Sequence, residues 1–210
     1  MLRRGTMAAA MLVLATAACG TAAGQTQPAA APMPMPADTA RPGVSPADVA
    51  FMRGMIAHHG QALEMTALVP ARTTSESMRL LARRIDISQQ GEMAMMRRWL
   101  ADRGQDTTAA MQHDMHAGMP GMQHAAMPGM LTPEEMARLA AATGPGFERL
   151  FLEGMIRHHE GALRMVADLL ATPGAAQDSE TFRFASDVDA DQRAEIARMQ
   201  AMLATLQTPR

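Results

Sequence analysis

Two segments of this chain repeat one pattern of potential metal ligands. FMRGMIAHHGQALEM covers residues 51–65 and FLEGMIRHHEGALRM covers residues 151–165, and nine of the fifteen aligned positions are identical. Imidazole is the commonest protein ligand for metals, and thioether sulfur is a soft ligand. Because each copy has a methionine three residues before a His-His pair, the doubled pattern predicts a pair of metal sites. The candidate ligands are Met55, His58, His59, Met155, His158 and His159.

Residues 111–130 hold a second group of potential ligands. Six methionines and three histidines fall within these twenty residues, between glycines and prolines and without the periodicity of a buried helix face. Thioethers select Cu(I), imidazole accepts Cu(I) and Cu(II), and Ag(I) suits the same ligands, whereas zinc favours Cys, His and carboxylate. The stretch therefore predicts binding of copper, with silver as a second soft cation. Its candidate ligands are Met111, His113, Met115, His116, Met119, Met122, His124, Met127 and Met130.

On a helix, both histidines of each pair lie on the face that should be buried. Steps of three and four residues put His58 in one stripe with Met55 and put His59 in the adjacent apolar stripe, and the second copy repeats this arrangement. Gly54 and Gly154 each stand four residues before a histidine, where glycine costs about 1 kcal/mol against alanine. We expect each glycine to leave room for a ring or for a close neighbouring helix.

A buried imidazole needs hydrogen-bond partners, and the next helix of each half offers a glutamate. Glu92 and Glu195 occupy equivalent places in the repeat, within the segments QQGEM and QRAEI. Both fall on the apolar stripe of their helix, so we expect them to face inward and to orient a ligand histidine through its second ring nitrogen. The alternative interpretation is structural, with core histidines held by glutamates and methionines that only pack.

Helix signals divide the chain into two repeated hairpins. Ser45 offers an N-cap followed by proline at the first helical position, and Pro70 is expected to end that helix at about Val69. Thr73-Thr-Ser-Glu76 resembles a capping box that starts a second helix. The expected helices run from 46 to about 69, from 76 to about 102, from the turn at 143–146 to about 170 and from about 178 to 206, with one short helix after Thr132.

Two similar helical hairpins with a long connection between them are typical of a four-helix bundle. We predict an all-α protein, a ferritin-like four-helix bundle built from two repeated helical hairpins and joined by one long crossover connection. The bundle domain is expected to cover residues 45–207. Within it, the connection carries the Met/His-rich insertion at 105–131.

The first 18 residues predict a signal peptide of the lipoprotein type. Arg3 and Arg4 give a positive start, and the apolar stretch at 7–18 is too short to span a membrane as a helix. Small residues ending at Cys19 resemble a bacterial lipobox with Cys19 as the lipidated residue, although Thr16 stands where leucine is usual, which leaves ordinary cleavage after an Ala-x-Ala site open. Residues 19–44 are predicted to be a disordered linker. We expect an exported protein, either periplasmic or a membrane-anchored lipoprotein.

Composition excludes some functions and favours others. A formal net charge of −2 provides no basic excess for binding nucleic acid. A single cysteine excludes an intrachain disulfide. Methionine is the outlier at 23 residues. Met and His ligands suit an oxidising compartment, where thiolates would be lost to oxidation.

The doubled Met-x-x-His-His motif, each copy followed by a Gln-x-x-Glu-[Met/Ile] helix, resembles the bacterial "domain of unknown function 305" family over about residues 46–207. Members of that family include periplasmic copper-binding proteins of the CopM type. The resemblance implies a ferritin-like fold, a secreted or lipid-anchored location, and a role in copper binding and resistance. Carried over by position, the Met and His residues of the family motif correspond to Met55, His58, His59, Met155, His158 and His159.

The function expected from the sequence is envelope copper binding for buffering, carriage or resistance, without enzymatic activity. Copper is the expected metal, and the expected partners are copper ions, silver, the membrane through a lipid anchor on Cys19, and envelope copper-handling proteins. One alternative is a ferritin-like metal-dependent oxidase, but a di-iron site needs inward Glu-x-x-His motifs, and neither His-His pair has a glutamate at that spacing. A structural helical lipoprotein is the other alternative, and it leaves residues 111–130 unexplained.

Overall fold

The computed structural model describes residues 44–106 and 127–207, within the unit that Ala40–Arg210 forms. The predicted signal peptide, Cys19, most of the linker and the potential ligands from Met111 to His124 lie outside the described residues. The described part contains helices and no strand, which confirms the all-α prediction. None of its helices combines the length and the apolar composition needed to cross a membrane.

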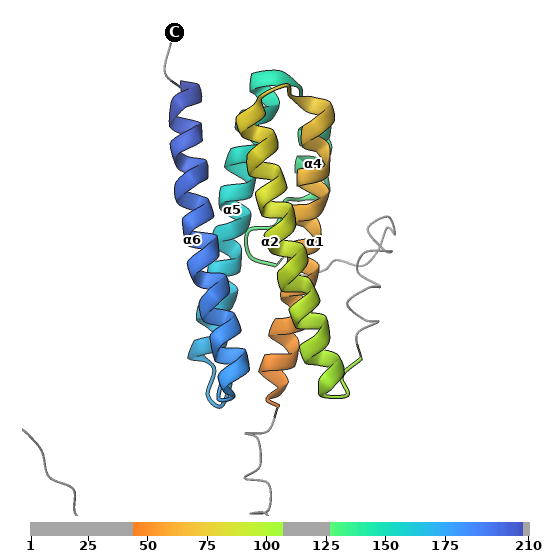
Figure 1. Ribbon diagram of the computed structural model, residues 1–210, viewed down its shortest axis with the longest axis vertical. Helices are drawn as coiled ribbons and strands as arrows, with labels where there is room; N and C mark the ends of the chain where they lie inside the picture. The colour runs from red at the N-terminus through yellow and green to blue at the C-terminus, as the bar shows by residue number, and fades with distance from the viewer. Residues whose placement is uncertain (1–43, 107–126, 208–210) are drawn as a thin grey trace, which may run out of the picture. The chain divides into compact units, whose positions relative to one another are not determined.

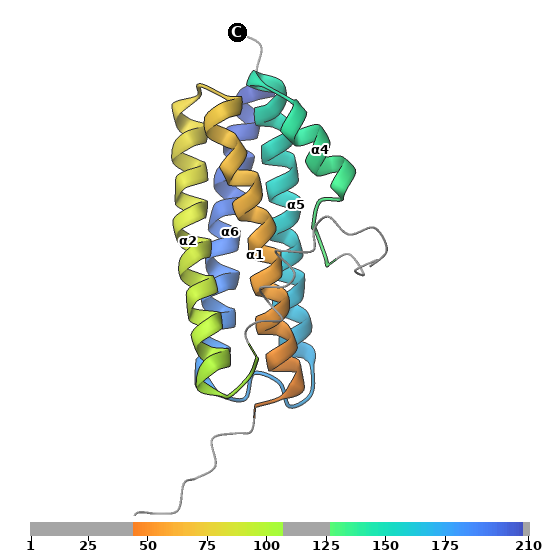
Figure 2. The same ribbon diagram turned by 90° about the vertical axis from the view of Figure 1, so that its right-hand side faces the viewer.

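Four long helices form the bundle, and one short helix covers it. The long helices are α1 (Pro46–Arg72), α2 (Glu76–Asp102), α5 (Gly144–Ala171) and α6 (Ser179–Gln207), and the short one is α4 (Pro133–Ala141). Helix α1 packs against α2, α5 packs against α6, and the two hairpins meet through α1 and α5. Figures 1 and 2 show α2 and α6 along one side of the bundle, with α4 crossing beside α5. The connection from α2 to α5 is the single long crossover of a ferritin-like bundle.

One predicted helix end and one predicted N-cap were wrong, whereas the predicted bounds of the second helix, 76 to about 102, are confirmed. Pro70 does not end α1, which continues to Arg72 with the proline inside its last turn. A proline there removes one intrahelical hydrogen bond, close to the point where the helix stops in any case. The N-cap of α2 is Ser75, whose side chain accepts from the Met78 amide, rather than Thr73. Thr73 instead donates its hydroxyl to Glu148 on the other hairpin.

Repeat-equivalent acids fasten each hairpin to the loop of the other. Asp48 near the start of α1 accepts a hydrogen bond from the Ala176 amide in the α5–α6 loop at 2.7 Å. Glu148 near the start of α5 accepts from Thr73 in the α1–α2 loop. Both carboxylates are buried. The duplication is therefore visible in how the two halves hold each other, as well as in their helices.

The core has a polar layer between two apolar clusters. One cluster contains Phe51, Met55, Trp99 and Phe184, and the other contains Met65, Leu81, Phe147 and Met155. Along all four long helices, a few buried polar residues separate the part that joins one cluster from the part that joins the other. We call these residues the polar layer: His58, His59, Gln89, Glu92, His158, His159, Gln192 and Glu195, all less than 9% exposed.

Candidate metal site in the polar layer

The second histidine of each pair is held by the glutamate of its own hairpin. His59 Nε2 lies 2.5 Å from Glu92 Oε2, and His159 Nε2 lies 2.6 Å from Glu195 Oε2. The imidazole rings are fully buried, and each glutamate is 6% exposed. Glu92 also accepts a hydrogen bond from Ser88 at 3.2 Å. The structure thus places both glutamates inward, each against one ring of its own pair.

The first histidine of each pair lies at the junction of the two hairpins. The rings of His58 and His158 stack with their centroids 3.8 Å apart and their planes at 36°. His158 donates from Nε2 to the His58 carbonyl at 2.9 Å, and His58 donates from Nε2 to the Pro128 carbonyl at 3.0 Å. A carbonyl can only accept, so in both rings the proton is on Nε2. The two copies of the motif therefore contribute to one continuous layer at the junction of the hairpins.

Each of the four rings leaves one nitrogen without a partner. The Nδ1 atoms of His58, His59, His158 and His159 are buried and have no hydrogen-bond partner among the described residues. Because Nε2 carries the proton in the neutral ring, Nδ1 presents a lone pair. A buried acceptor without a partner costs about 1–3 kcal/mol, which a bound cation would remove. A carboxylate on one ring nitrogen with the other left free is the arrangement typical of a metal-binding histidine.

Burial keeps the stacked rings neutral. The loss of hydration and, as the next cause, the neighbouring His59 lower the pKa of His58 to about 3. Burial also holds the pKa of His158 well below its usual value, with His58 as the next cause. At neutral pH, no proton therefore competes with a cation for these two rings.

The described end of the Met/His-rich insertion packs against the polar layer. We call residues 127–131 the strap. Besides the bond from His58 to Pro128, Gln61 donates to the Leu131 carbonyl at 2.9 Å and accepts from the Leu131 amide at 2.7 Å. Gly129 adopts a φ of +79°, and a Cβ on Gly161 of α5 would lie only 1.8 Å from the Pro128 oxygen. Both glycines are needed because the strap runs against the backbone of α5.

The thioethers beside the motif glycines are only partly those predicted. Met55 and Met155 are fully buried, one in each apolar cluster. A Cβ placed on Gly54 would lie 3.3 Å from the Met165 methyl carbon and 3.8 Å from the Met127 sulfur. On Gly154 it would lie 3.4 Å from the Met65 methyl carbon. The sequence analysis did not include Met65 and Met165 among the candidate ligands, although their repetition at the end of both copies was a signal.

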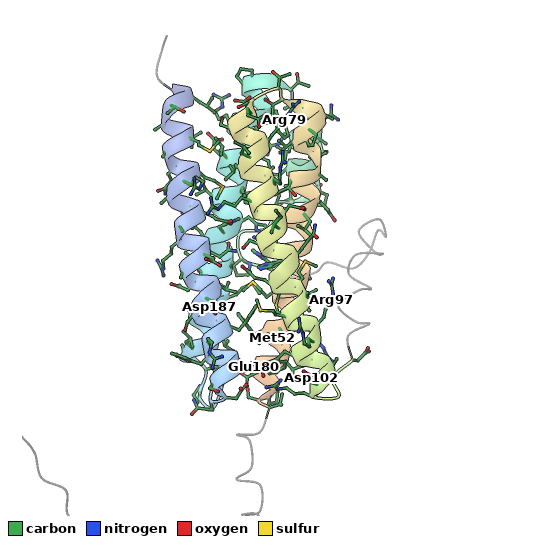
Figure 3. All side chains as sticks on the ribbon, in the orientation of Figure 1. Met52, Arg79, Arg97, Asp102, Glu180 and Asp187 are labelled. Atoms are coloured by element: carbon green, nitrogen blue, oxygen red, sulfur yellow. The ribbon has the colours of Figure 1, made fainter. Side chains whose placement is uncertain are left out.

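Gln89 and Gln192 are the polar-layer members that the ligand prediction did not include. Both amide atoms of Gln89 and the oxygen of Gln192 are buried without a partner in the described part of the chain. They belong to α2 and α6, one turn before Glu92 and Glu195. The exposed Asp191 lies close by: its pKa is raised by partial burial and then by the charges of Glu92 and Glu195. Figure 3 labels Asp187 on α6, on the side of the bundle along which α2 and α6 run.

The described residues do not bring together in one place enough of the side chains that usually hold zinc and other divalent metals. They contain no group of three or more His, Cys, Asp or Glu side chains placed to hold one metal ion. A metal site among these residues would therefore need a ligand of another type beside imidazole, and thioether sulfur is one that the structure places near the motif glycines. That ligand set suits soft cations such as Cu(I) and Ag(I) and does not suit zinc. Met130 lies in the strap, half-buried, whereas Met111 to His124 are outside the described residues.

Comparison with known proteins gives one family and several related structures. The family model "Domain of unknown function (DUF305)" matches residues 48–203. A DUF305 fragment from Deinococcus radiodurans is 33% identical, covering 77% of this chain and 98% of the fragment with a TM-score of 0.64. A DUF305 protein from Streptomyces coelicolor, predicted to be secreted, is 31% identical over 76% of this chain and 93% of its own, with a TM-score of 0.63.

A third related structure contains a metal. CopM in its Cu(II)-bound form is 26% identical to this chain, covering 75% of it and 96% of CopM with a TM-score of 0.60. No curated protein matches the chain.

Proposed function

Because the chain belongs to the DUF305 family, we propose that it is an exported copper-binding protein of the bacterial envelope that buffers, carries or detoxifies the metal. The proposal is for stoichiometric binding and not for catalysis. Copper is its cargo, Ag(I) is a second cation that the same ligands would take, and Cys19 would carry a lipid anchor. Envelope proteins that handle copper are the partners that would deliver or receive the ion.

One observation carries the proposal: four fully buried imidazoles each leave Nδ1 without a partner among residues 44–106 and 127–207. A layer that served only to hold the hairpins together would gain nothing from four unused lone pairs, and each of them costs stability. Glu92 and Glu195 fix the proton of His59 and His159 on Nε2, which leaves Nδ1 free for a cation.

Two further observations support copper in particular. Methionine side chains lie beside both motif glycines, with the sulfur of Met127 at Gly54, and a thioether needs no deprotonation before it binds Cu(I). CopM, which shares the fold and 26% of its residues with this chain, has been solved with Cu(II) bound. Under the proposal, the ligands from Met111 to His124 bind copper in addition to the bundle.

The competing account is that the histidines are structural. It is favoured by the fact that every Nε2 already has a partner within the protein and that no group of three His, Cys, Asp or Glu side chains is placed for a metal in the described residues. The two accounts differ in what happens when the imidazoles are removed. A structural layer would lose stability without any change in copper binding.

A copper titration can separate these accounts. The background is the full-length chain in which the seven Met and His residues from Met111 to His124 are replaced, Met by Leu and His by Gln; we call it the loop-ligand background. Metal-free protein is titrated with Cu(I) against a competing chelator. We expect bound copper to remain in this background and to be lost on His58→Ala with His59→Ala. Gln89→Leu is the matched control, because it alters the polar layer without removing an imidazole.

Thermal unfolding of the metal-free variants completes the comparison. If the loop-ligand background binds no copper, and the double His variant only lowers the unfolding temperature, the structural account holds and a bundle site is refuted. If the double variant loses copper but circular dichroism shows that its helices are intact, the imidazoles bind the metal.

A further inference from the structure

The two ends of the strap contact the two motif glycines, Gly54 and Gly154, through side chains of different types. Met127, at its start, places its sulfur 3.8 Å from the Cβ position of Gly54. Leu131, at its end, places a methyl carbon 3.2 Å from the Cβ position of Gly154. The two helices that it bridges are copies of each other, whereas the strap occurs once. The surroundings of the two motif copies are therefore unequal.

Two methionine side chains meet at Gly54, and His58 lies one turn further along α1. Met127 supplies one thioether from the strap, and Met165 supplies a second from α5, with its methyl carbon 3.3 Å from the same Cβ position. His58 follows one turn later on α1 and bonds through Nε2 to Pro128, the residue after Met127. Its Nδ1 is buried and without a partner in the described residues.

The other copy lacks one of these ligands. Met65 lies beside Gly154 as Met165 lies beside Gly54, but the strap contributes the hydrocarbon side chain of Leu131 there. His158 bonds to the His58 carbonyl, not to the strap. Leucine and methionine have similar volumes, so packing alone does not require a thioether at either glycine. The chemical difference between the two places is one sulfur atom.

We propose that the bundle contains one soft-cation site, at Gly54, formed by the sulfurs of Met127 and Met165 and by His58, and that Leu131 leaves the equivalent place at Gly154 without one. This inference rests on the proposed function and specifies its ligands. Two thioethers and one imidazole are uncharged, soft donors, which suit a monovalent cation, Cu(I) or Ag(I), over Cu(II) or zinc. The glycine is part of the site because a side chain at residue 54 would fill the space between the two methionines.

The proposal explains why the strap is tied down so closely. The two bonds to Gln61, the bond from His58 and the Gly129–Gly161 approach all fix the strap against α1 and α5. A methionine at the start of a fixed segment loses less freedom when it binds than a methionine on a free loop. The same fixation keeps Leu131 in place at the other glycine.

The test uses Ag(I), which does not change oxidation state, in the full-length loop-ligand background. Competition titration gives stoichiometry and affinity, and NMR of methionine methyl groups labelled with ¹³C identifies which sulfurs bind. We expect one bound ion per bundle and shifted methyl signals for Met127 and Met165. Met127→Leu or Met165→Leu should lower the affinity by about tenfold or more, since even partners that only orient a ligand contribute 10–100-fold.

Two substitutions beside the other glycine serve as matched controls, one that removes a thioether and one that adds a thioether. Met65→Leu, the equivalent change at the other glycine, should leave affinity and stoichiometry unchanged. Leu131→Met should add a second bound ion, because it restores the missing thioether. Unfolding curves of the metal-free variants should coincide, since leucine and methionine exchange at nearly constant volume.

The outcomes separate this inference from the function on which it rests. If the loop-ligand background binds no Ag(I) or Cu(I), the Gly54 site and any other copper site in the bundle are refuted, and only the ligands from Met111 to His124 remain to support the proposed function. If it binds the ion but Met127→Leu and Met165→Leu keep the full affinity, only the Gly54 site is overturned and the bundle remains a copper-binding domain. An equal loss from Met65→Leu would likewise overturn the single, unequal site.

Discussion

Gly161→Ala should destabilise the protein, although it exchanges a poor helix former for the best one. Gly161 is buried inside α5, and a Cβ there would lie 1.8 Å from the Pro128 oxygen and 2.5 Å from the Pro128 carbonyl carbon. No rotamer change can relieve this overlap because the contacting atoms are backbone. The strap therefore has to move away from α5.

The structure sets the size of the effect. Displacing the strap removes three hydrogen bonds, from His58 to Pro128 and the two between Gln61 and Leu131. At about 0.5–1.5 kcal/mol each, their loss exceeds the gain of about 1 kcal/mol from helix propensity. We expect the free energy of unfolding to fall by about 2 kcal/mol, which lowers the unfolding temperature by about 4–8 °C in a domain of this size.

Denaturant unfolding of metal-free protein, followed by far-ultraviolet circular dichroism, measures this change. Gly91→Ala is the matched control, because Gly91 is exposed in α2 and has no atom within 4 Å of its Cβ position. It should stabilise the protein by up to about 1 kcal/mol. If Gly161→Ala is as stable as the wild type or gains as much as Gly91→Ala, the close approach of strap and helix is refuted.

Three further changes test other parts of the structure. Gln89→Leu should raise the free energy of unfolding by about 1 kcal/mol in a denaturant titration, because it removes two buried amide atoms that have no partner in the described part of the chain; unchanged or lower stability would indicate partners for them. Asp48→Ala should lower it by about 1–3 kcal/mol through loss of the bond to Ala176, while the exposed Asp168→Ala should not. The pKa of His58, about 3 when folded and about 6.5 when unfolded, means that only the unfolded state takes up its proton between these values. The contribution of this group to the stability of the metal-free protein should therefore be full above about pH 6.5. It should fall as the pH drops toward 3, by up to about 1.4 kcal/mol per pH unit. Thermal unfolding at several pH values measures this change, and a flat profile would contradict it.

The fold could be predicted because its sequence signals are local and occur in both halves of the repeat. Stripes at helical spacing, the Ser45 cap and the repeated motif specified two helical hairpins, and the crossover helix followed from the cap at Thr132, whose side chain accepts from the Glu135 amide. The inward positions of Glu92 and Glu195 followed from the same periodicity. The wrong helix end at Pro70 and the wrong cap at Thr73 lie where the last turn of a helix or a tertiary contact competes with a local rule. Thr73 donates its hydroxyl to Glu148, which belongs to the second hairpin, so this hydrogen bond exists only in the tertiary structure.

The sequence by itself determined which residues are buried and polar, because burial follows from position on a helix face. It also determined the soft-ligand chemistry of the chain, because that is a property of methionine and histidine wherever they lie. Only the tertiary structure decided which ligands meet. Met127 and Met165 are far apart in the sequence, and neither belongs to the Met-x-x-His-His motif, yet both reach Gly54 because α1 packs against α5 and the strap crosses between them. Likewise, a symmetric repeat predicts two equal sites, but a connection that occurs only once must contact the two copies through different residues. The difference between Met127 and Leu131 therefore arises from the packing of the crossover, which helical periodicity does not encode.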